Sequence, residues 1–183
     1  MKCLGILWNT VHPMKEEVLK DICIFGDLIE YHDLNLEKDY ERFVRDIYEQ
    51  DQIATWKVDK KLETMFASTD ARKVCVFIVD ISTDEIYFHP YKKTNVFKNI
   101  EEMKVSIREK YKNKVNVYFF DNIMHLNDDE NEYERDLEVV QKFMNIVGLN
   151  PIQNQENSLF EDSVQQEEIV LKKTLGKILP NES

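Results

Sequence analysis

The chain has 183 residues, of which 43% are hydrophobic, and its formal net charge is −11. This length is sufficient for one domain with a sizeable core. The negative charge disfavours contact with the phosphate backbone of DNA or RNA, so nucleic-acid binding is not expected. The N-terminal residues MKCLGILWNTVHP are too short and too interrupted for a signal peptide or a membrane span.

The cysteine pattern argues against a metal site and against secretion. Cys3, Cys23 and Cys75 all lie in apolar runs and show no CxxC or Cys/His spacing, so a zinc site is not expected. An odd number of thiols fits a reducing compartment better than an oxidising one. We therefore expect a soluble, cytoplasmic protein that does not contact a membrane.

Hydrophobic periodicity predicts the elements of the first half of the chain. Strands are indicated by short β-branched or alternating runs, and helices by apolar residues three and four positions apart. The predicted ranges are a strand over 2–9, a helix over 14–24, a strand with a bulge over 27–36, and amphipathic helices over 37–51 and 54–68.

The second half begins with the strongest strand signal, KVCVFIVDI over 73–81, which is apolar on both faces as a central strand should be. A loop region that could begin with a short strand extension is predicted over 82–99, followed by a helix over 100–113 and a last strand over 115–120. A long helix then follows the capping candidates Asn127 and Asp128.

Two strand–helix–strand units side by side predict an α+β ferredoxin-like sandwich, with a four-stranded antiparallel sheet and helices on one face. The domain is expected over 1–149. Residues 150–183 are rich in Gln, Asn and acidic residues and are predicted to form a linker and an amphipathic tail helix around Ile169–Leu179. That helix could pack on its own domain, on a partner or on a second copy.

His125 is the main candidate for chemistry. It is expected at a strand–helix junction, where free amides and the helix dipole meet. A structural core or capping histidine would occupy the same position. The nearby carboxylates Asp128, Asp129 and Glu130 could favour the protonated ring, orient a neutral ring or hold a metal.

Several short segments resemble the nucleoside diphosphate kinases, and together they extend over most of 4–143. The segment NIMHLNDDENEYERDLEVV is similar to the family's N-x-x-H-G-S-D motif and the acidic helix behind it. It places Asn122, His125 and Asp128 at the family's spacing. SIREKY resembles the family's T-I-R-G-D segment, with Arg108 as its arginine, and Thr94 begins a match to the family's T-N-P.

The segment from Ile47 to Ser68 is similar to the family's helical hairpin. Tyr48 occupies the tyrosine position, and Trp56 and Leu62 fall near the nucleotide-base clamp. The resemblance implies a ferredoxin-like fold, a nucleoside di- or triphosphate as ligand, magnesium as cofactor and a homo-oligomer. It also implies that His125 attacks the γ-phosphate and forms phosphohistidine.

The chain departs from the family pattern where phosphate is held. The family's first-strand lysine is missing, and Trp8 and Asn9 stand in that neighbourhood. Lys92 and Lys93 are the cations near a segment where the family has an arginine. The sequence therefore predicts a nucleotide-binding protein with altered or lost phosphotransfer. The alternatives are an active phosphotransferase that uses His125, and a protein-interaction module that uses the acidic surface and the tail helix.

Overall fold

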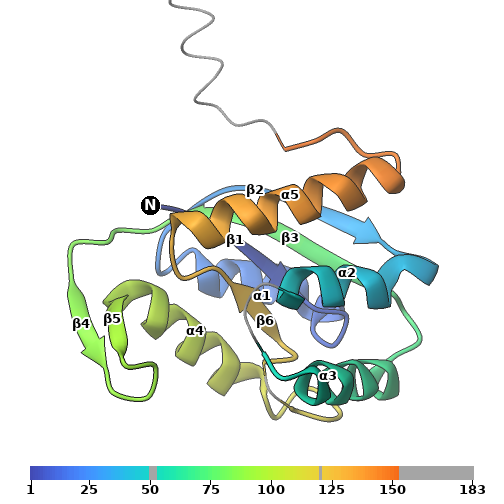
Figure 1. The fold of residues 1–183 in the computed structure, drawn as a ribbon, viewed down its shortest axis with the longest axis horizontal. Coiled ribbons are helices and arrows are strands. Elements are labelled where there is room, and N and C mark those ends of the chain that lie inside the picture. Colours follow the sequence, from blue (N-terminus) through green and yellow to red (C-terminus); the bar gives the residue numbers. More distant parts are fainter. Residues whose placement is uncertain (50–52, 120, 153–183) are drawn as a thin grey trace, which may run out of the picture. The chain divides into compact units, whose positions relative to one another are not determined.

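The computed structural model describes residues 1–49, 53–119 and 121–152, and Met1–Asn150 form one compact unit (Figure 1). The predicted tail helix lies outside the described residues. None of the helices in the described part of the chain combines the length and apolar content needed to cross a membrane. The elements are β1 (Lys2–Leu7), η1 (His12–Met14), α1 (Lys15–Ile22), β2 (Asp27–Asn35), η2 (Glu37–Asp39), α2 (Tyr40–Tyr48), α3 (Thr55–Ser68), β3 (Lys73–Asp80), β4 (Ile86–His89), β5 (Thr94–Phe97), α4 (Lys98–Tyr111), β6 (Met124–Leu126) and α5 (Glu130–Ile146).

The main sheet is antiparallel and has the strand order β2-β3-β1-β6. This is the strand order of the ferredoxin-like α+β sandwich, so the predicted fold class is confirmed. β3 pairs with β1 on one side and β2 on the other, as its apolar sequence predicted. The predicted bulge in β2 is also present, between Leu28 and Glu30.

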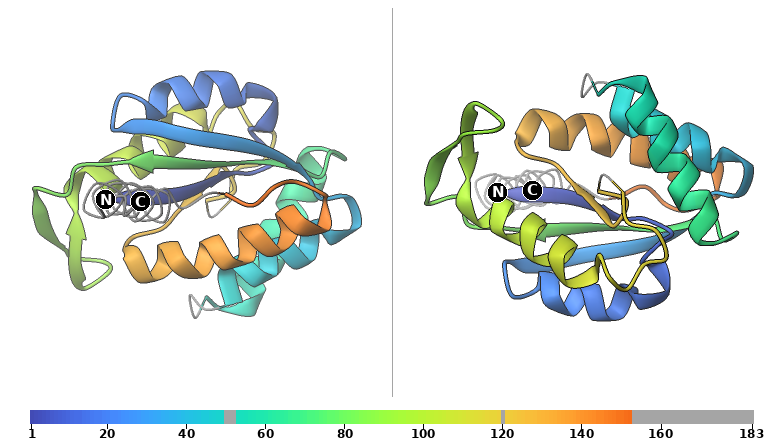
Figure 2. Two further views of the ribbon diagram at one scale, coloured as in Figure 1. Left: turned by 90° about the horizontal axis from the view of Figure 1, so that it is seen from above. Right: turned by 90° about the horizontal axis from the view of Figure 1, so that it is seen from below.

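Helices cover both faces of the sheet (Figure 2). On one face, Cys3 and Leu7 of β1 join a core that includes Val18 of α1 and Ile107 of α4. On the other face, α2 and α5 pack together and α5 contacts β1. The expectation of helices on one face only is wrong. In β1 and β3, the residues that point to each face of the sheet are buried, so both faces need to be covered by helices.

Gly5 lets β1 and β3 pack closely on the face covered by α1 and α4. Gly5 lies opposite Phe77 in the register, and a Cβ atom at Gly5 would overlap the Phe77 ring. The missing side chain therefore makes room for an aromatic ring in the centre of this core.

The amphipathic pattern of α2 predicted its packing correctly. All five residues expected on its inner face are buried, and three of them bring rings to the core. The ring of Phe43 lies 6.1 Å from that of Trp8 and 5.1 Å from that of Phe143 on α5, measured between centroids. The buried residues of α2 are Tyr40, Phe43, Val44, Ile47 and Tyr48.

Two predictions in the second half are wrong. The expected loop over 82–99 contains the hairpin of β4 and β5. The expected strand over 115–120 is absent from its described residues, 115–119, and the last strand is β6, farther along the chain. Asn122 provides the physical reason: its side chain donates to the carbonyl of Val117 at 2.7 Å and accepts from the amide of Phe119 at 3.4 Å. These bonds close a turn with peptide groups that a strand would use for pairing.

The N-cap of α5 is Asp129, and neither of the two predicted capping residues fills that position. The carboxylate of Asp129 accepts a hydrogen bond from the amide of Glu132 at 2.9 Å. Asn127 instead accepts from the amide of Leu4 at 2.6 Å and so joins the junction to β1. Asp128 forms ion pairs with lysines.

We expect Gly5→Ala to lower the free energy of unfolding by about 1–3 kcal/mol, because the added methyl group overpacks the core against Phe77. Urea denaturation measures the change. Phe77→Leu in the same background should recover part of the loss by removing the overlapping ring. A double variant whose loss equals the sum of the two single losses would contradict this account.

Candidate functional site

His125 lies in the middle of β6, opposite Ile6 of β1. Directly paired residues of antiparallel strands point to the same face of a sheet, so the His125 side chain points toward the layer that contains α5. Its neighbours Met124 and Leu126 point to the opposite face and belong to the core there. His125 is only 8% exposed.

A carboxylate from α5 holds the His125 ring. Nε2 of His125 lies 2.7 Å from Oδ2 of Asp136, and both side chains are buried. If Nε2 donates to this carboxylate, the neutral ring keeps its lone pair on Nδ1. The carboxylate that meets His125 is thus one that the sequence did not suggest, while Asp128 is paired elsewhere.

Tyr48 joins this pair to the helical hairpin of α2 and α3. Its ring is 5.4 Å from the His125 ring and 6.0 Å from the Trp8 ring, between centroids. Its hydroxyl accepts a hydrogen bond from Lys61 of α3, whose ammonium lies 4.2 Å from the centroid of the Tyr48 ring and 5.3 Å from that of Trp8. We call His125, Asp136, Tyr48, Lys61 and Trp8 the His125 cluster.

Lys92 and Asp128 lie together in a second group, the α4 ion network. Nζ of Lys92 is 2.6 Å from Oε1 of Glu101 and 3.0 Å from Oδ2 of Asp128, and Lys104 also pairs with both carboxylates. Burial alone would raise the pKa of Asp128. The charges and hydrogen bonds of Lys104 and Lys92 outweigh burial and lower that pKa from 3.8 to about 2.

Arg108 lies near β6 but its charge is already matched. Its Nη2 donates to the carbonyl of Met124 at 3.3 Å, and its Nε lies 3.0 Å from Oδ1 of Asp121. The side chain thus ties α4 to the chain just before and within β6. A phosphate at this guanidinium would have to displace a carboxylate.

Asn122, Leu62, Trp56 and Thr94 are the other predicted contact residues. Asn122 is fully buried and holds its own turn, and Leu62 is part of the core. Trp56 is 62% exposed on α3, and Thr94 is exposed in β5. Among the described residues, no hydrogen bond or ion pair joins any of these four to His125.

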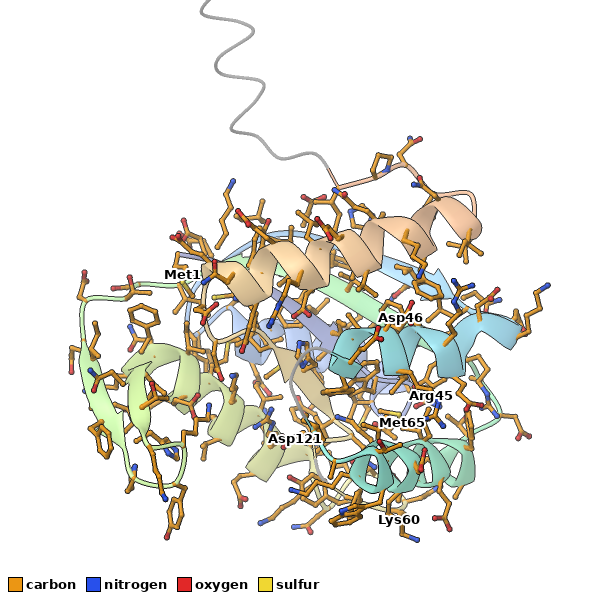
Figure 3. All side chains as sticks on the ribbon, in the orientation of Figure 1. Met1, Arg45, Asp46, Lys60, Met65 and Asp121 are labelled. Atoms are coloured by element: carbon orange, nitrogen blue, oxygen red, sulfur yellow. The ribbon has the colours of Figure 1, made fainter. Side chains whose placement is uncertain are left out.

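A cavity of about 310 Å³ opens at the junction of α2 and α3, and Tyr48 forms part of its wall. Figure 3 labels Arg45 and Asp46 on this part of α2. Arg45 pairs with Asp59 of α3, and Asp46 pairs with Lys142 of α5. We call this cavity the α2–α3 pocket; it is lined by Arg45, Asp46, Tyr48, Glu49, Ile53, Thr55 and Val58.

The sequence contained signals for the two site residues that it did not suggest. Asp136 lies three residues after Tyr133 and four before Val140, on the apolar stripe of a helix. Lys61 occupies the same kind of position between Val58 and Met65. A charged residue on the buried face of an amphipathic helix requires a polar partner, and this expectation marks both positions.

The fold can be compared with known proteins at this point. No family model matches the chain, and no curated protein matches it in sequence. Among solved structures, it is similar to the nucleoside-diphosphate kinase from Borrelia burgdorferi, determined as a transition-state mimic with bound vanadate and ADP. The TM-score is 0.46 and the identity 14%, over 85% of this chain and 94% of that one. The vanadate and ADP belong to that protein.

We expect Asp136→Ala to lower the free energy of unfolding by about 2–4 kcal/mol, because it leaves a buried imidazole nitrogen without its partner. Glu30→Ala is a matched control, since Glu30 pairs with His32 at 2.8 Å in a more exposed position. The control should cost less than about 1 kcal/mol. Equal losses in urea denaturation would show that burial of the His125 pair adds nothing.

The pH dependence of unfolding should report on Asp128. Its pKa in the folded protein is about 2, below the ordinary aspartate value of 3.8. The resulting stabilisation is complete above the unfolded value and is lost as the pH falls through the folded one. We expect a loss of roughly 1–2 kcal/mol between pH 4 and pH 2, after allowance for partial exposure of the group.

Asp128→Asn should remove this part of the pH dependence, because the amide does not titrate. The free energies of unfolding of the variant and the wild type should therefore converge as the pH approaches 2. Parallel curves for the two proteins over this range would contradict the assignment to Asp128.

Proposed function

We propose that the chain binds a ligand of the nucleoside or nucleotide class and does not transfer phosphate through His125. The binding site is the α2–α3 pocket. The observation that carries the proposal is the position of Tyr48, which forms a wall of this pocket and also contacts the His125 ring. A pocket of about 310 Å³ is at the lower end of the usual range for small-molecule sites.

The surroundings of His125 support the loss of phosphotransfer. Phosphoryl transfer depends on positive charges placed around the transferring group. Arg108 is engaged by Asp121, and Lys92 and Lys104 are engaged by Glu101 and Asp128. Trp8 directly follows β1, in the neighbourhood where the resemblance implies a lysine, and it is fully buried.

Magnesium belongs to this proposal only as a companion of the ligand's phosphates. In the described residues, no three His, Cys, Asp or Glu side chains are grouped so that they could hold a metal ion. The described residues therefore support no step through magnesium.

One observation favours the second candidate, an active phosphotransferase. The Asp136 carboxylate fixes the His125 ring through Nε2, which suits Nδ1 for attack on a phosphorus atom. In that reaction Nδ1 would form a bond to the γ-phosphorus of a nucleoside triphosphate while the bond to the β-bridging oxygen breaks. The diphosphate leaves with the electron pair, and the phosphoryl group then passes to a second diphosphate.

Thermal-shift and calorimetric titrations with nucleosides and their mono-, di- and triphosphates test the proposal, with and without magnesium. We expect a saturable rise in Tm for wild type and for His125→Gln, because ligand binding to the folded state stabilises it. After incubation with triphosphate, intact mass should show no added phosphoryl group on either protein.

Acid-labile phosphate on the wild type that is absent from His125→Gln would establish the second candidate. His32→Gln is the control for loss of a histidine, because His32 lies on β2 and pairs with Glu30. The absence of binding by every nucleoside and nucleotide would overturn both candidates and favour the protein-interaction alternative.

A further inference from the structure

We propose that the α2–α3 pocket selects an uncharged nucleoside, so that each added phosphate weakens binding. This inference rests on the proposed function and names its ligand class. It reverses the usual expectation for a nucleotide site, in which phosphates supply much of the affinity through cations and helix N-termini.

The apolar part of the pocket suits a planar ring. Tyr48, Val58 and Ile53 are the aromatic and aliphatic side chains in the cavity lining. Flat heteroaromatic groups gain dispersion and stacking energy on such a wall, and neither requires a charge on the ligand. This part of the pocket can therefore hold a base without help from phosphates.

Arg45 is the cation in the described lining of the pocket. Its guanidinium pairs with two carboxylates. Its Nε and Nη2 lie 3.0 and 2.8 Å from Oε1 of Glu41, and its Nη1 lies 2.9 Å from Oδ1 of Asp59. These bonds also raise the pKa of Arg45, with the hydrogen bonds to Glu41 and Asp59 as the main causes. A phosphate would have to compete with both carboxylates for the guanidinium.

Glu49 gives the pocket an acceptor in place of a cation. It lines the cavity at the C-terminal end of α2, and it has no hydrogen bond or ion pair to any other described residue. Its carboxylate can accept N–H groups of a base or hydroxyl groups of a ribose. The C-terminal end of a helix is also the negative end of its dipole, which adds repulsion for a phosphate.

The net charge of the whole protein is negative, like the charge of Glu49 and of a phosphate. The whole chain carries a formal net charge of −11. Beside the pocket, the Asp46 carboxylate lies 2.7 Å from Nζ of Lys142, so this nearby lysine is also engaged. A ligand with two or three phosphates therefore approaches a protein of the same charge sign, and this repulsion weakens as salt is added.

Calorimetric titration of the full chain with adenosine, guanosine and their mono-, di- and triphosphates, without magnesium, tests the inference. At low salt we expect Kd to rise roughly two- to fivefold with each added phosphate, and the differences to shrink at high salt. Affinity that increases with phosphate number would overturn this inference and leave the proposed function standing. No binding by any member of the series would overturn the proposed function, and this inference with it.

Two variants tie the effect to the pocket. Glu49→Gln removes the charge that faces the ligand, so the penalty for the diphosphate relative to the nucleoside should decrease. Glu102→Gln is the matched control, because Glu102 is exposed on α4 and lies outside the pocket lining; it should leave the order of affinities unchanged. Equal effects of the two variants would contradict the role of Glu49.

Thr55→Trp tests the location without touching the core. Thr55 is exposed at the start of α3 and lines the cavity, so an indole there should fill it. We expect at least a tenfold loss of nucleoside affinity with an unchanged thermal unfolding curve of the free protein. Unchanged affinity in a folded variant would place the ligand elsewhere and overturn the assignment.

Discussion

The central constraint in this protein is the position of β1, which pairs with β3 on one side and β6 on the other and is covered by helices on both faces. Its register with β3 requires a glycine where Phe77 fills the core. Its register with β6 places His125 opposite Ile6, on the side of α5. The strand that organises the core therefore also decides which face the candidate histidine points to.

Burial then determines how the polar groups around His125 must be arranged. A buried imidazole needs a partner, and Asp136 supplies it from α5. The same requirement explains the α4 ion network, in which the largely buried Lys104 and Glu101 are matched together with Lys92 and Asp128. Such pairing stabilises the fold against the cost of desolvation, and it also consumes the charges that a phosphate would need.

The proposed ligand class follows from this distribution of charge. An active phosphotransferase needs cations that can pair with phosphate, whereas Arg45, Lys92, Lys104 and Arg108 are held by carboxylates. Lys61 of the His125 cluster is engaged by the hydroxyl and ring of Tyr48. What the pocket offers is an aromatic wall and the acceptor Glu49. The arrangement favours recognition of a base and a sugar over recognition of a phosphate chain. The free-energy cost of removing water from an uncharged ring is small when the ring enters such a site.

The sequence by itself determined the order of the elements from β1 to β3, the inner face of α2, the bulge in β2 and the central place of β3, because these depend on local periodicity. Tertiary structure alone decided that helices cover both sheet faces, that Asn122 closes a turn and that Asp136 meets His125. The sequence also placed the acidic residues after His125, but it could not tell Asp128 from Asp136. That choice depends on the direction in which β6 presents its side chains and on how α5 packs across β1. Contacts between separate elements are set by packing of the whole core, so a local pattern can mark a buried charge but cannot name its partner.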